Sequence, residues 1–283
     1  MPSGLFLLAS LALFVLPGTA VPSPDSLGTG LQILLHNDLY GAESSRTDAV
    51  IVLDTAQTQS AAASDCAALG EALWTPPTDL TANDFLAYLA YESAAEANST
   101  QSGSWKEKRG YPPQFGHGPP SWGPPHGPSG RQQLYFIAGN GPNGACQAIT
   151  PEAQVVDVNC NAVLPALCTQ SAPASGMNYS DTSAQFQTAV TSGSATYTGY
   201  RDAVSFRFLG IQYGTYPQRF TYSSVYNNSG AVSALQFGAI CRQIDAITGV
   251  NDGSEDCLHL NIWTPYVPSP QEKSPRLRPV MFW

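Results

Sequence analysis

The sequence predicts an α+β domain stapled by disulfide bonds, followed by a second domain built mainly from antiparallel strands. Three observations lead to this prediction. The 283 residues contain six cysteines, four of them between positions 66 and 168 and two at positions 241 and 257. Strand-like segments accompany alanine-rich helical segments in the first part, whereas alternating apolar and polar residues predominate in the second. Apolar residues make up 43% of the chain, which is enough to build real cores.

Residues 1–20 have the composition of a secretory signal peptide. An apolar run from Leu5 to Leu16 is followed by Pro17 and small residues, with cleavage expected near Ala20. No Lys or Arg precedes the run, which departs from the usual pattern. The run is too short for a membrane anchor, which needs about 20 apolar residues, and no other segment is apolar enough to span a bilayer. We therefore expect a soluble, secreted protein.

The charge of the chain limits its partners. The chain has 21 acidic residues against 12 Lys and Arg, and its formal charge is −9. The resulting pI of about 4.7 disfavours nucleic acid and anionic membrane surfaces as partners. The sequence does not indicate an oligomeric state.

Secretion would place the cysteines in an oxidising environment, where disulfides form and persist. Six cysteines can form three disulfides. Zinc is the competing interpretation, but no CxxC spacing occurs and His259 is the one histidine close to any cysteine. We therefore predict disulfides and no metal site. Three acceptor triplets begin at Asn98, Asn178 and Asn227, which would be glycosylated on this route if exposed.

The first domain is expected over residues 48–170. Residues 21–47 carry few periodic signals and are expected to form a leader into it. The expected elements are a strand over residues 48–54, helices over 59–73 and 80–97, and a strand over 134–140.

A proline- and glycine-rich segment interrupts the first domain between residues 103 and 130. Proline pairs remove backbone donors and glycines oppose regular structure, so this segment is expected to be an exposed, disordered loop. Its histidines, His117 and His126, could together hold a metal ion, but no third ligand accompanies them. A polyproline-like linker loop is the favoured interpretation.

The second domain is expected over residues 184–283, after a small, polar linker at residues 171–183. Leu258, Leu260 and Ile262 alternate with polar positions, which is the period of a half-buried strand. The expected elements are a hairpin around Gly193, a third strand over residues 204–214, a helical stretch near 234–247, a turn at 251–253, a strand over 258–264 and an apolar segment over 279–283.

Three pieces of this second domain carry a family resemblance. They are FLGIQYG at residues 208–214, QRF at 218–220 and SEDCLHLNIWTP at 254–265. On these motifs the domain resembles the N-terminal portion of type-B carboxylesterases, the cholinesterase- and lipase-like branch of the α/β-hydrolases, especially their secreted fungal members. Gln212 stands where the family often has proline, and His259 where it usually has an aromatic residue.

The resemblance implies an incomplete α/β-hydrolase domain, of which this chain holds the N-terminal, mainly antiparallel strands. It also implies that Glu255 pairs with Arg219 and that Cys257 forms a disulfide with Cys241. A buried guanidinium needs a planar acceptor, and we expect the neighbouring strands to shield this pair. Glu255 and Asp256, which precede Cys257 directly, then need no catalytic role.

The first domain resembles a C-type lectin-like domain over about residues 45–170. The order of its four cysteines and its LPALC ending carry this resemblance, which implies the pairs Cys66–Cys168 and Cys146–Cys160. The Glu-Pro-Asn, Gln-Pro-Asp and Trp-Asn-Asp triplets of the sugar-binding members are missing, so calcium-dependent sugar binding is not expected. A disulfide-stapled domain without lectin kinship is the alternative.

The groups that an esterase needs for catalysis are missing from the sequence. No GxSxG elbow and no HGGG-type oxyanion turn occur. We therefore expect the N-terminal portion of a secreted carboxylesterase or lipase-like hydrolase, with no catalytic residue and no cofactor in this chain. An ester would be its substrate only after completion by a C-terminal hydrolase part. The alternative is a non-catalytic secreted binding module whose first domain is lectin-like.

Overall fold

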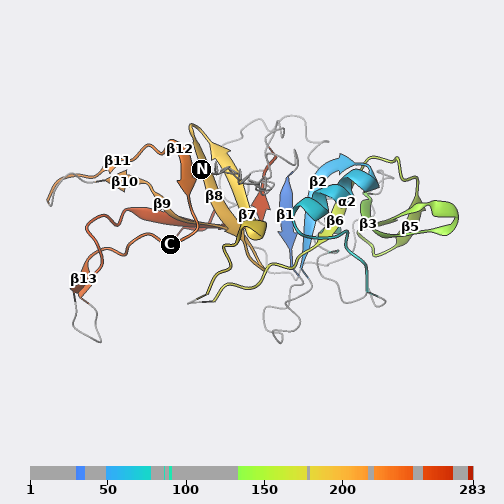
Figure 1. Ribbon diagram of the computed structural model, residues 1–283, viewed down its shortest axis with the longest axis horizontal. Helices are drawn as coiled ribbons and strands as arrows, with labels where there is room; N and C mark the ends of the chain where they lie inside the picture. The colour runs from blue at the N-terminus through green and yellow to red at the C-terminus, as the bar shows by residue number, and fades with distance from the viewer. Residues whose placement is uncertain are drawn as a thin grey trace, which may run out of the picture.

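The computed structural model describes residues 30–35, 49–77, 86, 89–90, 133–176, 179–215, 220–244, 251–269 and 280–282. The expected signal peptide, the loop over 103–130 and most of the predicted helix over 80–97 lie outside these residues. In the described part of the chain, strands form most of the regular structure (Figure 1). No helix among the described residues has the length and apolar content needed to cross a membrane.

The larger sheet has seven strands and is antiparallel except between β6 and β3, which run parallel. The order across the sheet is β16 (Tyr266–Val267), β1 (Leu31–Leu34), β2 (Val50–Gln57), β6 (Leu164–Thr169), β3 (Tyr135–Asn140), β4 (Cys146–Ile149) and β5 (Val155–Val158). The strands predicted over residues 48–54 and 134–140 are therefore confirmed as β2 and β3.

Strand β2 is buried on both faces. Its residues Val50, Ile51, Val52 and Leu53 are each no more than 1% exposed. Successive side chains of a strand point to opposite faces, so Ile51 and Leu53 enter one apolar cluster and Val50 and Val52 enter another. A continuous β-branched run is what a strand covered on both faces requires.

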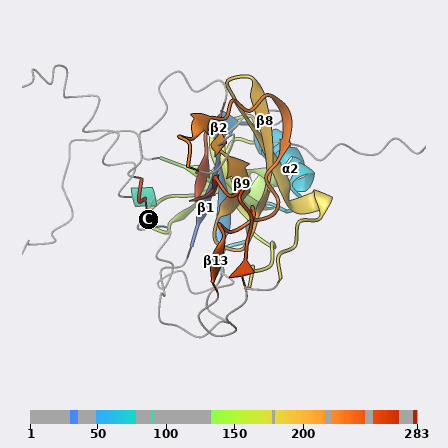
Figure 2. The same ribbon diagram turned by 90° about the vertical axis from the view of Figure 1, so that its left-hand side faces the viewer.

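One helix, α2 (Gln59–Ala68), lies on one face of the larger sheet, as Figures 1 and 2 show. Its start is capped by Thr58, whose Oγ1 accepts a hydrogen bond from the N–H of Ala61 at 3.4 Å. The helix predicted over residues 59–73 ends at Ala68, because Gly70 adopts a positive φ of 75°, which is typical of a residue that terminates a helix. Ala62 and Cys66 point into the core.

The smaller sheet lies beside the larger one along the long axis of the molecule (Figure 1). The predicted hairpin is confirmed as the β7–β8 pair, which turns at Gly193, and the third strand is confirmed as β9. The order is β12 (Gly230–Ser233), β8 (Ala195–Arg201), β9 (Phe206–Gln212) and β15 (His259–Thr264), with β7 (Gln187–Ser192) also paired to β8.

Four very short strands and two 3-10 turns complete the described elements. They are the pair β10 (Gly214–Thr215) and β11 (Ser224–Val225), the pair β13 (Gln243–Ile244) and β14 (Asn251–Asp252), and the turns η2 (Pro142–Gly144) and η3 (Ala184–Phe186).

The helix predicted near residues 234–247 is wrong for the described residues 234–244. Their backbone bonds to distant segments instead, since Leu209 N–H donates to the Ala234 carbonyl at 2.8 Å and Ser254 N–H donates to the Ile240 carbonyl at 2.8 Å. Gly238 packs so closely on His259 that an added Cβ would lie 2.4 Å from its ring. Apolar residues at helical spacing are also compatible with an extended chain, and here tertiary bonding decides.

Residues 21–47, expected as a leader, contain strand β1, which is fully part of the larger sheet. Its outer neighbour is β16, which lies more than 230 positions later in the chain and crosses the expected boundary at residues 171–183. One apolar cluster likewise joins Leu31 and Ile51 to Phe206 and Phe208. The two parts of the chain therefore share a core.

Three disulfides cross-link the fold, and their pairing is the one that the family resemblances imply. Cys66–Cys168 ties α2 to β6, Cys146–Cys160 closes a short loop, and Cys241–Cys257 ties the segment before β13 to the entrance of β15. The resemblance of the first part to a C-type lectin-like domain stays a prediction from sequence.

The long-range disulfide should contribute more stability than the short one. Cys66 and Cys168 are 102 positions apart, whereas Cys146 and Cys160 are 14 apart. The chain-entropy relation gives about 4.7 kcal/mol for a loop of about 100 residues and about 3 kcal/mol for one of about 15. We expect Cys66→Ala/Cys168→Ala to lower the free energy of unfolding in guanidinium chloride more than the matched control Cys146→Ala/Cys160→Ala. An equal or smaller loss would contradict this.

Candidate functional site

Two of the three motif segments lie side by side in the smaller sheet. FLGIQYG forms most of β9, and SEDCLHLNIWTP leads into and forms β15. The two strands pair antiparallel, with Leu260 opposite Ile211 and Ile262 opposite Phe208. Of the third segment, QRF, the structure describes Phe220 alone, whose side chain is 99% exposed. The sequence motifs thus correspond to one two-stranded ladder.

A β-bulge in this ladder explains why Gly210 and Asn261 occupy their positions. The register shifts between Leu260 and Ile262, and the side-chain Oδ1 of Asn261 accepts a hydrogen bond from the N–H of Gly210 at 2.8 Å. Gly210 has φ 68°, and an added Cβ would lie 2.4 Å from the Gln236 carbonyl oxygen. Only glycine combines this conformation with such a close approach.

The half-burial predicted for the face with Leu258, Leu260 and Ile262 does not extend to the end of β15. Ile262 is 43% exposed and its neighbour Trp263 is 40% exposed. The extra residue of the bulge lies in β9, where Leu209 and Gly210 stand opposite Asn261, so Leu260 and Ile262 keep their spacing of two along β15. Trp263 contacts Phe237, with ring centroids 6.3 Å apart.

The acid pair at the entrance of β15 lies at the surface. Asp256 accepts a hydrogen bond from the Gln212 amide at 3.2 Å, and an oxygen of Glu255 lies 3.8 Å from Nε of Arg242. The side chain of Glu255 is 45% exposed, so the neighbouring strands do not shield this glutamate as expected. Arg219 lies outside the described residues, and its pairing with Glu255 stays a prediction. Exposed pairs of this kind are worth about 0–1 kcal/mol.

The predicted glycosylation sites are described in part. Asn227 is exposed next to β11, whereas Asn98 and Asn178 lie outside the described residues. His117 and His126, considered for a metal, lie outside them as well. Within the described residues no three His, Cys, Asp or Glu side chains gather as a metal site would require.

His259 is the one histidine in the described part of the chain. Its Nδ1 is buried and has no hydrogen-bond partner there. A histidine that serves as general base is held by hydrogen bonds to a nucleophile and to an orienting acid. The described residues around His259 do not make that arrangement, and the imidazole instead packs against Gly238.

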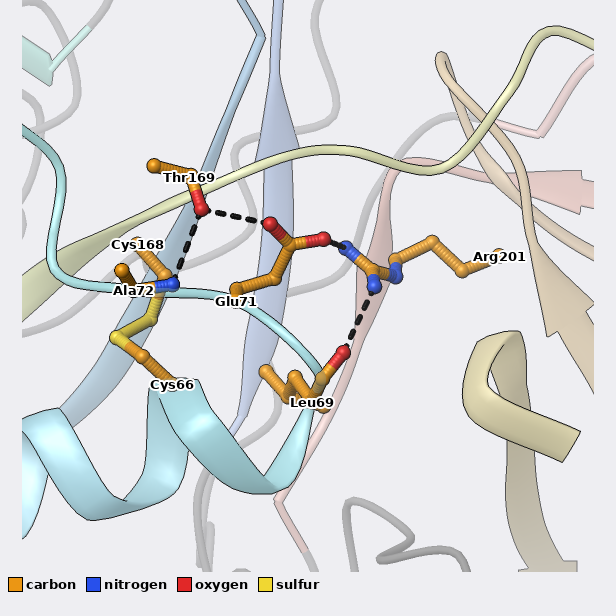
Figure 3. The surroundings of a disulfide bond; sticks show 7 residues. All are labelled: Cys66, Leu69, Glu71, Ala72, Cys168, Thr169 and Arg201. Carbon is orange, nitrogen blue, oxygen red and sulfur yellow. Dashed lines mark hydrogen bonds and ion pairs between the residues drawn. A yellow bond between two sulfur atoms is a disulfide. The ribbon is translucent and has the colours of Figure 1, made fainter.

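The strongest polar cluster lies elsewhere, between the two parts of the chain, and includes Glu71 and Arg201 (Figure 3). Nη1 of Arg201 lies 2.8 Å from an oxygen of Glu71, and the two side chains are 3% and 1% exposed. Nη2 of Arg201 donates to the Leu69 carbonyl at 3.0 Å, and Nη1 also contacts the Gln170 amide oxygen. Burial lowers the pKa of Arg201, and the attraction of Glu71 opposes this shift.

The Glu71 carboxylate is held independently of Arg201. One oxygen accepts from the Thr169 hydroxyl at 2.6 Å, and the other accepts from the N–H and the hydroxyl of Ser171 at 2.9 and 2.7 Å. These donors satisfy the lone pairs that a buried carboxylate would otherwise leave unpaired. The Phe186 ring lies 5.4 Å from the Arg201 guanidinium carbon, a cation–π distance.

A second buried pair follows Arg201 directly. Asp202 is 1% exposed and pairs with Arg207, while its other oxygen accepts from the N–H groups of Val204 and Ser205 at 3.0 and 2.9 Å. Asp202 thereby fixes the turn between β8 and β9. The first pair joins segments from the two parts of the chain, and the second closes the β8–β9 turn.

Sequence reasoning missed Glu71, Arg201, Asp202 and Arg207 as a group. Arg201 and Asp202 lie between the expected hairpin around Gly193 and the expected strand over residues 204–214, in a connection where charged residues are usually exposed. One signal was available. Charged residues make up just 12% of this chain, and Arg201 directly follows the apolar and aromatic strand residues ATYTGY.

Large apolar side chains are exposed mainly in the C-terminal part. Such residues are rarely gathered on one stretch of a monomeric soluble protein. The group comprises Tyr213, Phe220, Tyr222, Val225, Tyr226, Phe237, Ile240, Ile244, Ile262, Trp263, Val280, Met281 and Phe282, each at least 40% exposed.

The close approach at Gly210 should make this position intolerant of a side chain. Gly210→Ala meets both a positive φ and the Gln236 carbonyl, whereas the matched control Gly193→Ala meets a positive φ of 61° and no atom within 4 Å. We expect Gly193→Ala to cost about 1–2 kcal/mol of unfolding free energy and Gly210→Ala about 1–3 kcal/mol more. Thermal or denaturant unfolding measures the difference, and equal losses would show that the bulge is not constrained.

Comparison with known proteins bears on the C-terminal part of the chain. No match was found among curated protein sequences. Residues 180–283, which include the β9–β15 ladder, match the model of the Carboxylesterase family. This match supports a carboxylesterase-type domain in the C-terminal part of the chain.

Proposed function

We propose that this chain carries the N-terminal portion of a secreted carboxylesterase- or lipase-like hydrolase, which cleaves carboxylic esters once further polypeptide supplies its catalytic groups. The observation that carries this proposal is the Carboxylesterase family match over residues 180–283. Two of the three motif segments that carried the resemblance pair as β9 and β15.

Ester cleavage needs catalytic groups that this sequence lacks, so the proposal includes further polypeptide that supplies them. Acyl transfer needs a nucleophile activated by a base, and preorganised donors for the oxyanion. The 283 residues contain neither a GxSxG elbow nor an HGGG-type turn. His259, packed on Gly238, has no hydrogen bond at Nδ1 that would orient it as a base.

The exposed apolar side chains between Tyr213 and Phe282 support the proposal that further protein covers this part of the chain. Burying apolar surface yields about 25 cal/mol per Å². Side chains such as Phe220 and Tyr222, at 99% and 97% exposure, would therefore favour association with additional hydrolase elements.

The proposed secretion rests on two features. Residues 1–20 have a signal-peptide composition, and all six cysteines are paired in three disulfides. Disulfides form and persist in the oxidising secretory route. The N-glycans proposed at Asn98, Asn178 and Asn227 belong to the same route.

The chain as written should not hydrolyse esters. We expect purified residues 21–283 to release nitrophenol from nitrophenyl esters at the rate of a boiled control, and a fluorophosphonate probe to label no serine. An active serine hydrolase run in parallel validates both assays. Turnover clearly above the boiled control, together with covalent labelling of a serine in this chain, would contradict the proposal that its chemistry comes from further polypeptide.

Reading the transcript beyond the Trp283 codon tests the family assignment separately. We expect an in-frame HGGG-type segment followed by a GxSxG elbow. A stop codon directly after Trp283 would instead favour a non-catalytic secreted binding module.

A further inference from the structure

The two parts of the chain are joined by contacts that resemble an interface between two proteins. We call residues 30–176 the N-terminal part and residues 179–282 the C-terminal part, each as far as it is described. Contacts of three kinds cross between them in the described residues. Arg201 of the C-terminal part enters the Glu71 cluster, β16 pairs with β1, and apolar residues of both parts enter one cluster.

No disulfide crosses between these parts. Cys66–Cys168 and Cys146–Cys160 lie within the N-terminal part, and Cys241–Cys257 lies within the C-terminal part. Because all six cysteines are paired, noncovalent contacts and the backbone between Gly176 and Tyr179 hold the two parts together.

We propose that the N-terminal part is a docking partner for the carboxylesterase-type part, which it binds through a guanidinium receptor built from Glu71, Gln170 and the Leu69 carbonyl. The guest that this receptor fits is a strand that ends in arginine, here β8 with Arg201. The exposed edge of β1 captures a second strand of the same guest, β16. This inference rests on the contacts alone and stands whether or not the chain is part of a hydrolase.

The receptor is preorganised by the N-terminal part itself. Thr169 and Ser171 hold the Glu71 carboxylate through hydrogen bonds that do not involve Arg201. Leu69 follows the last turn of α2, where carbonyl groups lack helical partners and carry the negative end of the helix dipole. Cys66–Cys168 ties this helix end to β6, which carries Thr169 at its end (Figure 3). Preorganisation of this kind lowers the entropy lost on binding.

The strand capture is a second, backbone-mediated contact. Leu31 pairs with Val267 and Gln32 with Tyr266, and the N–H of Ile33 donates to the Pro265 carbonyl at 2.8 Å. Adding a strand to an open sheet edge is a common way in which one protein binds a segment of another. Tyr266 and Val267 are 7% and 2% exposed, so the captured strand is buried by the pairing.

Arg201 should be the hot spot of this interface. It is the buried arginine at the centre of the contact, surrounded by acceptors and by the Phe186 ring. Buried arginines of this kind dominate measured interfaces. Removing the charge of Glu71 would leave the guanidinium buried without its counter-ion.

A cut between the parts tests the proposal in the full chain. A protease site is placed between Gly176 and Tyr179, the protein is tagged at residue 21, cleaved after folding and immobilised, and release of the C-terminal fragment is followed. We expect the fragment to stay bound in the otherwise unchanged protein. With Glu71→Gln we expect release to be faster by about 100-fold or more. The matched control Arg242→Gln, at the exposed pair with Glu255, should change release by less than about fivefold.

Arg201→Lys keeps the test decisive if Glu71→Gln does not fold. Lysine preserves the charge but loses the planar fork that reaches Glu71 and the Leu69 carbonyl together, so release should be faster by about 10-fold or more. Immediate loss of the fragment from the otherwise unchanged protein would overturn the proposal. Retention that neither Glu71→Gln nor Arg201→Lys weakens would overturn it as well.

Discussion

The fold depends on one buried guanidinium–carboxylate contact, between Arg201 and Glu71. Both side chains are almost fully removed from water in a chain of which 12% is charged. Desolvating two charges is unfavourable unless every lone pair and proton finds a partner. Here Thr169 and Ser171 donate hydrogen bonds to the carboxylate, and the Leu69 carbonyl and the Gln170 amide oxygen accept from the guanidinium. The contact therefore requires the end of α2, the end of β6 and the end of β8 to meet at one point.

That requirement gives the Cys66–Cys168 disulfide a role beyond chain entropy. The disulfide fixes the end of α2 against β6, and these elements present the Leu69 carbonyl and the Glu71 carboxylate to Arg201. From Arg201 the turn fixed by Asp202 leads directly into β9, and β9 pairs with β15. The N-terminal part is thus built into the same structure as the carboxylesterase-type segment, instead of being attached to it by a flexible linker.

Local sequence patterns predicted the elements that carry their own signal. The β-branched run of β2, the alanines of α2 and the alternation in β7, β8 and β9 identified strands and a helix close to their observed positions. Contacts between distant segments were not predictable in this way. Strand β1 has four residues and is defined by its pairing with β2 and β16, and Arg201 at a strand end looks like an ordinary surface residue. Residues 234–244 were misjudged because their extended form depends on bonds to β9 and to Ser254.

The distribution of polar and apolar side chains reverses the usual arrangement in the C-terminal part. The charged side chains of Arg201 and Asp202 are buried, whereas the aromatic side chains of Phe220, Tyr222 and Phe282 are almost fully exposed. Arg201 is paired with Glu71 and Asp202 with Arg207, so these buried charges give no drive for further association. The exposed aromatic residues do, because apolar surface in contact with water is unfavourable wherever a partner can cover it. Glu255, at the entrance of β15, is also open to solvent, with 45% of its side chain exposed. It lies 3.8 Å from Nε of Arg242, and an exposed pair of this kind contributes about 0–1 kcal/mol, so the charges that matter for stability in this part of the chain are the buried ones.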